Sequence, residues 1–185
     1  VNGDRQYPFV REGNNYVSEY VPQEGDHIKV TASHKDFKTV YGETDVPKRP
    51  KFGIDSYKVT QSSRLEFDLT IQDPEEEDNY YRLNAWQYQK FEWEEEEFLW
   101  INHSIYSNDP IFNSSQLGSY IDKIDGSDPK VPDFFDDGAF DGSSHCFRFW
   151  INFDHHEEDK SDDIRPEDFK LTVDAVSESL YRYSL

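Results

Sequence analysis

The sequence predicts an all-β protein, an antiparallel β-sandwich of the immunoglobulin-like kind. Three observations favour this class. Apolar and polar side chains alternate with a period of two in several stretches, as they do in strands with one solvated face. Aromatic residues make up 16% of a chain that is only 35% hydrophobic, and aromatic residues favour strands and bury large areas. Proline and glycine fall between the alternating stretches, as is typical of turns.

Two hairpins are predicted in the first half of the chain. Residues 27–33 (HIKVTAS) and 37–46 (FKTVYGETDV) form the first, joined through HKD. Residues 52–60 (FGIDSYKVT) and 64–72 (RLEFDLTIQ) form the second, joined at QSS. The last of these strands has the clearest alternation, with one face made of Leu65, Phe67, Leu69 and Ile71.

Residues 79–106 predict two further strands around a charged tip at Glu94–Glu97. A helix is the competing interpretation, because runs of glutamate favour helix. The β-branched and aromatic residues on both sides of the tip favour strands instead. Residues 145–154 (HCFRFWINFD) predict a strand that is partly covered on both faces, and residues 168–176 (DFKLTVDAV) predict another.

The rest of the chain has weaker patterns. Residues 107–142 have little periodicity and predict a long irregular insertion in the sandwich. The final SESLYRYSL predicts the start of a helix that is capped by Ser177. We expect residues 1–185 to form one domain.

The charge of the chain restricts its partners. The net charge is −20, which repels phosphates and anionic lipid headgroups, so we expect no nucleic-acid partner. Such a surface suits a cation or a neutral ligand. The single cysteine, Cys146, lies in an apolar run and is expected to be a buried thiol. There is no run of eighteen apolar residues that would predict a membrane-spanning helix.

The acidic stretch Asp73–Asp78 raises the question of a metal or substrate site. Its acids are consecutive and would point in alternate directions in an extended chain, and Asp-Pro is a turn signal, so we favour a solvated turn. A strand follows, with one tyrosine ring on each face. The candidates for ligand binding are Tyr80, Tyr81, Arg82 and Trp86.

A second acidic segment, residues 121–142, combines aspartate with glycine, as calcium-binding loops do. A structural Ca²⁺ is the only cofactor that the composition suggests. The spacing of an EF-hand is absent, and we favour aspartates that cap turns. The candidate ligands, if an ion binds, are Asp133, Asp136, Asp137 and Asp141.

The sequence contains no pattern that predicts catalysis. His155 and His156 are adjacent, so in a strand they would point oppositely and could not share a metal. There is no nucleophile elbow, and carboxylates are too numerous for a glycosidase pair to stand out. The four tryptophans could build a sugar-stacking platform, although most such rings in an all-β domain lie in the core. They are Trp86, Trp93, Trp100 and Trp150.

Five segments, in order over residues 16–185, resemble the DUF4249 family of Bacteroidetes lipoproteins. They are YVPQEGDHIKVTA, GETDVPKRPKFGID, DPEEEDNYYRL with its paired tyrosines, FDDGAFDG, and LTVDAVSESLYRYSL. The resemblance implies an exported protein, held at the outer membrane by a lipid anchor and found near TonB-dependent receptors. It also implies that the anchor, the first strands and the closing C-terminal segment of the family lie outside this chain. It carries no catalytic residues.

We therefore expect a non-enzymatic binding or assembly protein of the cell envelope, which acts beside a TonB-dependent receptor in nutrient uptake. The ligand would be a glycan or another nutrient. The sequence does not decide between the periplasmic and the surface face of the outer membrane. One alternative is a carbohydrate-binding module, which exposed coplanar aromatic rings would favour. Another is a glycan-acting enzyme with an acidic cleft, which two facing carboxylates, one of them buried, would favour. A protein–protein role predicts an exposed apolar patch.

Overall fold

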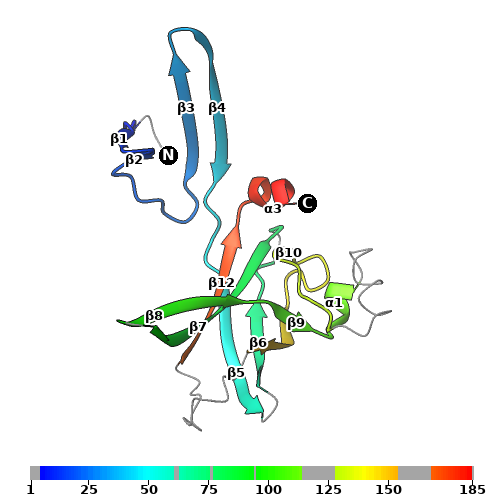
Figure 1. Cartoon of the computed structure of the whole chain (residues 1–185). Coiled ribbons are helices and arrows are strands. Elements are labelled where there is room, and N and C mark those ends of the chain that lie inside the picture. Colours follow the sequence, from blue (N-terminus) through cyan, green and yellow to red (C-terminus); the bar gives the residue numbers. More distant parts are fainter. Residues whose placement is uncertain are drawn as a thin grey trace. The chain divides into compact units, whose positions relative to one another are not determined.

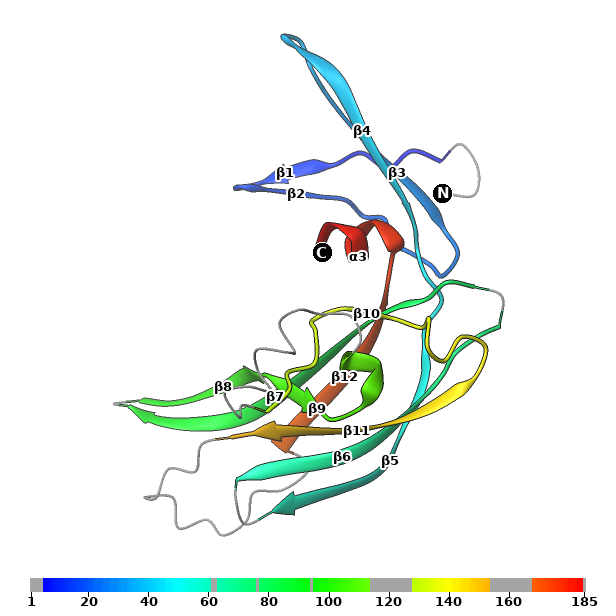
Figure 2. The same ribbon diagram turned by 90° about the vertical axis from the view of Figure 1, so that its right-hand side faces the viewer.

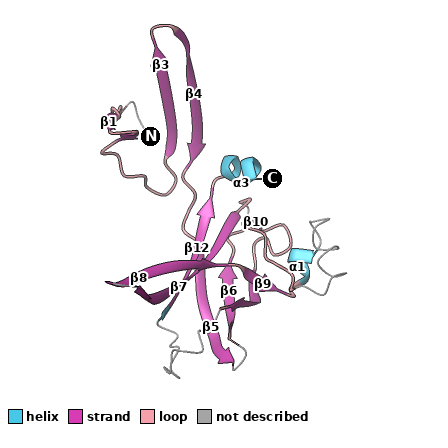
Figure 3. Ribbon diagram, in the orientation of Figure 1, coloured by secondary structure: helices cyan, strands magenta, loops and turns pink. Residues whose placement is uncertain are grey.

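The structure is a computed structural model that describes residues 5–60, 63–75, 77–93, 95–113, 128–153 and 168–184. Strands dominate it (Figure 3). The chain divides into two compact units, one of residues 1–49 with 176–185 and one of residues 50–175. The prediction of a single domain stays a prediction, because one domain can contain two compact units. Each unit is described by itself below.

The first unit contains two hairpins and a helix. The predicted hairpin through HKD is confirmed, and the turn between its strands is Lys35–Asp36. The predicted cap is confirmed too, because Ser177 Oγ accepts a hydrogen bond from the amide of Leu180 at 3.3 Å. The elements are β1 (Val10–Glu12), β2 (Asn15–Val17), β3 (His27–His34), β4 (Phe37–Asp45) and α3 (Glu178–Ser184).

The second unit is built from two antiparallel sheets, which lie one above the other in Figure 2. One sheet has the order β5-β6-β11-β9. These strands are Lys51–Thr60, Arg64–Gln72, Ser144–Asn152 and Ile105–Ser107 respectively. In the other sheet β7 is central, with β12 on one side and with β10 and β8 as its further partners. These are β7 (Tyr80–Trp93), β8 (Glu95–His103), β10 (Phe135–Asp136) and β12 (Phe169–Val176).

The order of the strands matches an immunoglobulin-like sandwich. In that fold a sheet of strands A, B, E and D packs against a sheet that contains C, F and G, with C′ beside C in variable-type domains. We assign β5, β6, β7, β8, β9, β11 and β12, in chain order, to A, B, C, C′, D, E and F. The observed neighbours are then A-B-E-D in one sheet and F-C-C′ in the other. Strands β7 and β8, assigned to C and C′, form the green hairpin in Figure 1. This confirms the predicted class.

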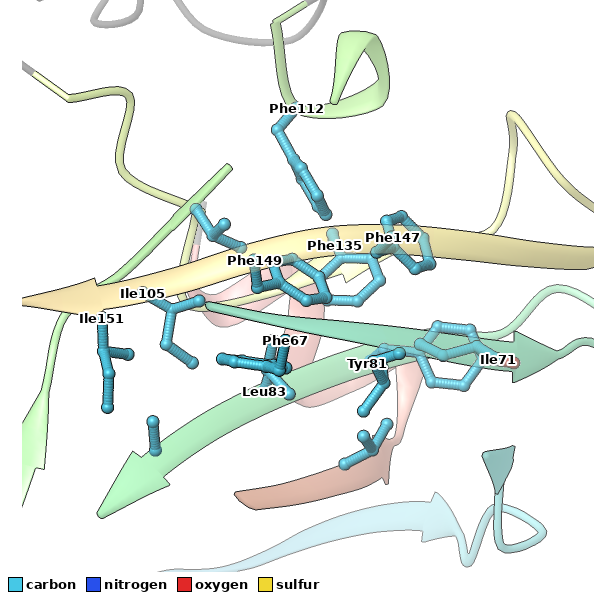
Figure 4. Close-up of a cluster of buried hydrophobic side chains, with 14 of the residues drawn as sticks. Phe67, Ile71, Tyr81, Leu83, Ile105, Phe112, Phe135, Phe147, Phe149 and Ile151 are labelled. Carbon is cyan, nitrogen blue, oxygen red and sulfur yellow. The ribbon is translucent and has the colours of Figure 1, made fainter. Parts of the chain in front are cut away.

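The core lies between the two sheets (Figure 4). The predicted apolar face of residues 64–72 is buried along its whole length. It meets Tyr81, Leu83 and Ala85 of β7 from the opposite sheet. Aromatic rings fill the space between them: Phe147 stacks on Phe149 at 5.4 Å between ring centroids. The period of two in the sequence thus becomes one dry face on each of β6, β7 and β11.

Residues 79–142 differ in detail from the structure that the sequence predicts for them. The two strands predicted around a glutamate tip are β7 and β8, so the helical alternative is wrong. The tip is narrower than expected, because Glu95–Glu97 already belong to β8. The predicted irregular segment contains a short helix, α1 (Pro110–Asn113), and strand β10; its residues 114–127 lie outside the described part of the chain.

The prediction of a buried thiol is wrong, because Cys146 is exposed. It pairs with Thr70 on the outer face of the sheet, one residue out of phase with the buried Phe147. No described segment forms a further layer over that position. Trp150 on the same face is covered by a stacked Tyr106 ring and by the Arg64 guanidinium, so this end of β11 is buried on both faces as predicted.

Within the described residues, none of the helices is long and apolar enough to span a bilayer.

Candidate functional site

The outer face of the β7–β8 hairpin gathers side chains suited to binding. Along β7, buried residues alternate with partly exposed ones, and the partly exposed ones all point away from the core. The antiparallel register adds two β8 residues to this face, because Trp86 lies opposite Asn102 and Tyr88 lies opposite Trp100. We call this set the outer strip. It consists of Arg82, Asn84, Trp86, Tyr88, Trp100 and Asn102.

One end of the outer strip is aromatic. Tyr88 and Trp100 are 40% and 49% exposed, although rings of this size usually lie inside. Their centroids are 5.1 Å apart and their planes meet at 43°, so the two rings form a corner rather than one flat platform. Trp86 is half-buried two residues further along β7. The exposed rings offer apolar faces on which a sugar ring can stack.

The other end of the outer strip lies at a polar pocket of about 340 Å³. The pocket lies where the chain passes at Ser104 from β8 in one sheet to β9 in the other. Residues 130–134 form its far wall, held by a hydrogen bond of 2.8 Å from the amide of Val131 to the carbonyl of Ile105. Its polar lining residues include Arg82, Asn84, Asn102, His103 and Lys130.

Strand β12 orients the two β7 residues of the pocket. Arg82 Nη2 donates to Asp174 Oδ2 at 2.9 Å, and the guanidinium lies 5.9 Å from the Phe134 ring centroid. Asn84 Nδ2 donates to the same Asp174 oxygen and to Thr172 Oγ1, each at 3.2 Å. Side chains held in this way lose less entropy when a ligand binds.

The lining favours a small ligand rich in oxygen. Amide, guanidinium, ammonium and imidazole groups donate hydrogen bonds to hydroxyls and carboxylates. His103 Nε2 lies 3.0 Å from Gln87 Oε1, and Lys130 Nζ lies 3.6 Å from Asp133 Oδ1. A few convergent polar groups beside aromatic surface are typical of ligand sites.

The four predicted ligand-binding residues separate by face. Tyr80, Arg82 and Trp86 lie on the outer face of β7. Tyr81 lies in the core, where its hydroxyl donates to Asp73, so it is not available to a surface ligand. Burial, and then the Asp73 carboxylate, raise the pKa of Tyr81 far above its usual value.

Several residues of the outer strip and the pocket were not among the ligand-binding candidates predicted from the sequence. The alternation of β7 already places Asn84 and Tyr88 beside Arg82 and Trp86, so the sequence contained that signal. Asn102 depends on the exact register of the hairpin. Lys130 lies far along the chain, and no local pattern connects it with β7.

The two acidic segments meet at a separate place. One carboxylate oxygen from each of Asp73, Asp137 and Asp141 lies within 4.8 Å of the others. Of the predicted metal ligands, Asp137 and Asp141 belong to this carboxylate cluster, whereas Asp133 and Asp136 do not. Asp73, which comes from the acidic stretch interpreted as a turn, was missed as a member.

Both buried carboxylates of the cluster have hydrogen-bond donors from the chain. Asp73 accepts from the Tyr81 hydroxyl and, at 3.0 Å, from the amide of Gly142. Asp137 accepts from the amide of Asn79 at 2.6 Å. Burial, and more weakly the Asp73 carboxylate, raise the pKa of Asp137. These bonds join the turn after β6 to the turn before β11.

The donor set of the cluster is all oxygen, which suits Ca²⁺ better than a transition metal. Calcium takes six to eight oxygen ligands, and three carboxylates supply part of such a shell. The chain's own donors already satisfy much of the two buried carboxylates. A stabilised turn therefore explains the cluster without an ion, and calcium binding stays a prediction.

The carboxylate cluster does not resemble the catalytic pair of a glycosidase. Such pairs are about 5–5.5 Å apart in retaining enzymes and further apart in inverting ones, with the sugar between them. The three residues of the cluster do not line the pocket, so they do not face a space that could hold a sugar there. Among the described residues that do line it, Asp133 is the one carboxylate.

Some predicted candidates cannot be placed. His155 and His156 lie outside the described residues, as does the side chain of Trp93.

Nearly the whole chain matches a known protein-family model. The model of a domain of unknown function, DUF4249, matches residues 1–184. No curated protein matches the chain, and no solved structure does.

Proposed function

The chain belongs to the DUF4249 family, and from this premise we propose that it is a non-enzymatic binding protein that captures a glycan on the outer strip of the β7–β8 hairpin. The sugar rings would stack on Tyr88 and Trp100. A polar end of the glycan would enter the pocket beside Arg82 and Asn84. The mechanism is capture, with no bond broken.

One observation carries the proposal: the exposed aromatic rings of the outer strip continue into residues that line a polar pocket. Trp86 links the two ends, because it follows Asn84 on the outer face of β7 and lies opposite Asn102, which lines the pocket. Aromatic faces suit the apolar side of a pyranose, and amides and guanidinium groups suit its hydroxyls or a uronic-acid carboxylate. The charge of −20 opposes polyanions, so a neutral or weakly acidic glycan fits best.

The cellular part of the proposal depends on the family resemblance. We propose an envelope protein at the outer membrane that works beside a TonB-dependent receptor. An assembly role is supported by the apolar side chains that the β3–β4 hairpin exposes, which include Val30, Phe37 and Val40. Membrane fractionation of the native host tests the location, and cross-linking in those membranes tests the receptor partnership.

The ligand proposal is tested by affinity electrophoresis through gels that contain a panel of neutral and acidic polysaccharides. We expect at least one polysaccharide to retard the protein. The double variant Tyr88→Ala and Trp100→Ala should migrate as it does in an empty gel, and Arg82→Ala should bind more weakly. Tyr41→Ala is the matched control, because Tyr41 is an exposed strand aromatic in the other unit.

Two results would contradict the proposal. The first is migration that no polysaccharide in the panel changes. The second is retardation that the double variant retains in full. Release of reducing sugar from a retarding polysaccharide would instead favour a glycan-acting enzyme.

A further inference from the structure

The strand pairing of β7 has a gap beside the pocket. β10 pairs with the first two residues of β7, on the edge away from β12. β8 pairs with β7 only from Ala85 onward. Three residues between these two pairings line the pocket, and no described strand pairs with them on this edge. They are Arg82, Leu83 and Asn84.

The gap presents backbone groups to a ligand. The N–H and C=O groups of successive residues in a strand point to alternate edges, so at least one of the three residues directs both groups toward the pocket. Three residues of a strand span about 10 Å. Because β10 and β8 close the two ends of the gap, it is too short for an extended peptide strand and suits a single small group instead.

The pocket also has an apolar part. Leu83, Ile105 and Val131 line it, and all three belong to the hydrophobic core between the sheets. Pro132 adds a fourth apolar side chain to the lining. A methyl group would be covered by these side chains, whereas a hydroxyl that lay against them would lose its hydrogen bonds to water.

Two carboxamide side chains lie beside the gap. Asn84 Nδ2 donates to Asp174 Oδ2 and to Thr172 Oγ1, which leaves Oδ1 as the group that Asn84 can offer to a ligand. Asn102 is exposed and lines the same pocket, and its amide both donates and accepts. The side chains and the β7 backbone therefore provide donors and acceptors together.

The charges of the lining do not favour an anionic group. Arg82 pairs with Asp174 at 2.9 Å, and Lys130 pairs with Asp133 at 3.6 Å. Each of the two basic side chains thus has a carboxylate partner. The net charge of −20 also opposes an anion, so a neutral group fits the pocket best.

We propose, on the premise that the outer strip captures a glycan, that the pocket selects a 2-acetamido sugar. An acetamido group is neutral and carries one N–H, one C=O and one methyl group. Its N–H would donate to Asn84 Oδ1 or to a β7 carbonyl, and its C=O would accept from a β7 amide or from Asn102. The methyl group would lie against the apolar part of the pocket. The rest of the glycan would extend over Trp86 toward the exposed rings of the outer strip.

The test measures the binding of three tetrasaccharides to the whole chain by isothermal titration calorimetry. Chitotetraose carries acetamido groups where cellotetraose carries hydroxyls, and both are neutral. The glucosamine tetramer carries ammonium groups there, which a chain of net charge −20 attracts. Aromatic rings stack on the sugar rings of all three. We expect chitotetraose to bind roughly tenfold more tightly than cellotetraose, because the pocket covers its methyl group.

A second measurement and two matched variants locate the acetamido group. Hydrogen exchange in residues 82–84 should slow more with chitotetraose than with cellotetraose. Asn84→Ala should weaken chitotetraose by roughly tenfold and cellotetraose by less, so that the preference shrinks. Asn108→Ala removes an exposed carboxamide that does not line the pocket and should leave the preference unchanged. Circular dichroism verifies that both variants fold.

Four outcomes overturn the selection of an acetamido sugar. Equal binding of chitotetraose and cellotetraose would do so and would leave glycan capture on the aromatic rings standing. Tighter binding of the glucosamine tetramer than of chitotetraose would mean attraction by charge. An equal loss of preference in the two variants would place the acetamido group away from the pocket. Binding of none of the three would also overturn it, and the polysaccharide panel then decides whether glycan capture falls as well.

Discussion

Strands β5 and β6 pair with each other and have the same alternation of side chains, but their inner side chains differ in burial. They pair residue by residue, so that Tyr57 lies opposite Phe67 and Ile54 lies opposite Leu69. The inner side chains of β6 are buried, and those of β5 are about half exposed. The comparison teaches that a period of two determines where a side chain points, whereas the opposite sheet determines whether that side chain is covered.

The largest expected effect separates these two strands directly. Phe67→Ala should lower the free energy of unfolding by about 3–5 kcal/mol, because it opens a cavity in the core. Tyr57→Ala should change it by no more than about 0.5–1 kcal/mol, since that ring is largely solvated. Urea denaturation followed by tryptophan fluorescence measures both. Equal losses of unfolding free energy would show that the inner side chains of β5 are covered in solution, as those of β6 are.

A smaller effect is expected on β7, which has two tyrosines on opposite faces. Tyr81→Phe removes the hydroxyl that donates to buried Asp73 and should cost about 1.5–3 kcal/mol, as for a hydrogen bond to a charged group. Tyr80→Phe is the matched control on the outer face and should cost less. The same denaturation experiment decides the order, and a larger loss for Tyr80→Phe would contradict the assigned faces.

The carboxylate cluster predicts a stability that depends on pH. Burial raises the pKa of Asp137 above the 3.8 of an unperturbed aspartate, so the folded state holds this proton more tightly than the unfolded state. The contribution of Asp137 to stability is therefore greatest below pH 3.8 and falls as the pH rises through the raised value. Asp137→Asn should raise the melting temperature at pH 7 in a chelator and change it little at pH 3. A lower melting temperature at pH 7 would contradict this.

The same melting experiment, repeated with Ca²⁺, tests whether the carboxylate cluster binds that ion. If the cluster binds Ca²⁺, millimolar Ca²⁺ should raise the melting temperature of the natural chain, and Asp137→Asn should abolish that rise. Asp133→Asn is the control, because Asp133 lies outside the cluster. If Ca²⁺ leaves the melting temperature unchanged, the cluster is a hydrogen-bonded turn and the calcium prediction is wrong.

The smallest effect is expected on the outer face of β6. The Arg148 guanidinium, with help from the Ser56 hydroxyl, lowers the pKa of Asp68. That pair therefore stabilises the fold above the unfolded pKa of 3.8, and the benefit is lost as the pH falls through the lowered value. Arg148→Ala should cause a slight loss of stability at pH 7 that disappears in 1 M salt, because exposed ion pairs are screened. A loss that salt leaves unchanged would indicate a packing role.

Much of the fold could be predicted because the strands and their inner faces depend on local alternation. The strand at residues 64–72, its hairpin partner and the Ser177 cap all follow from neighbours in the chain. Exposure of Cys146 could not be predicted, because it depends on whether another layer covers the sheet. The sequence shows that Cys146 and its neighbour Phe147 point to opposite faces of the strand. It does not show whether a further layer covers the face of Cys146.

The candidate sites were harder to predict for a related reason. Asp73 joins Asp137 because β10 pairs with the start of β7, at Asp136 and Tyr80, and this pairing has no local signal. The pocket wall at residues 130–134 depends on a bridge between Lys130 and Tyr106. The residue types indicated the chemistry of the carboxylate cluster and of the pocket. Pairing between strands that are far apart in the sequence determines which residues belong to each site.

The first unit has a further consequence for how the protein opens. Residues 5–49 include no buried side chain in the part that the structure describes, whereas the second unit has a full core. Isolated hairpins are only marginally stable in water. Proteolysis under native conditions should therefore cut β1–β4 before it cuts the described strands of the second unit, and calorimetry should still record the melting of that unit after β1–β4 have been cut. The protein would then keep its sandwich while its N-terminal hairpins open and close.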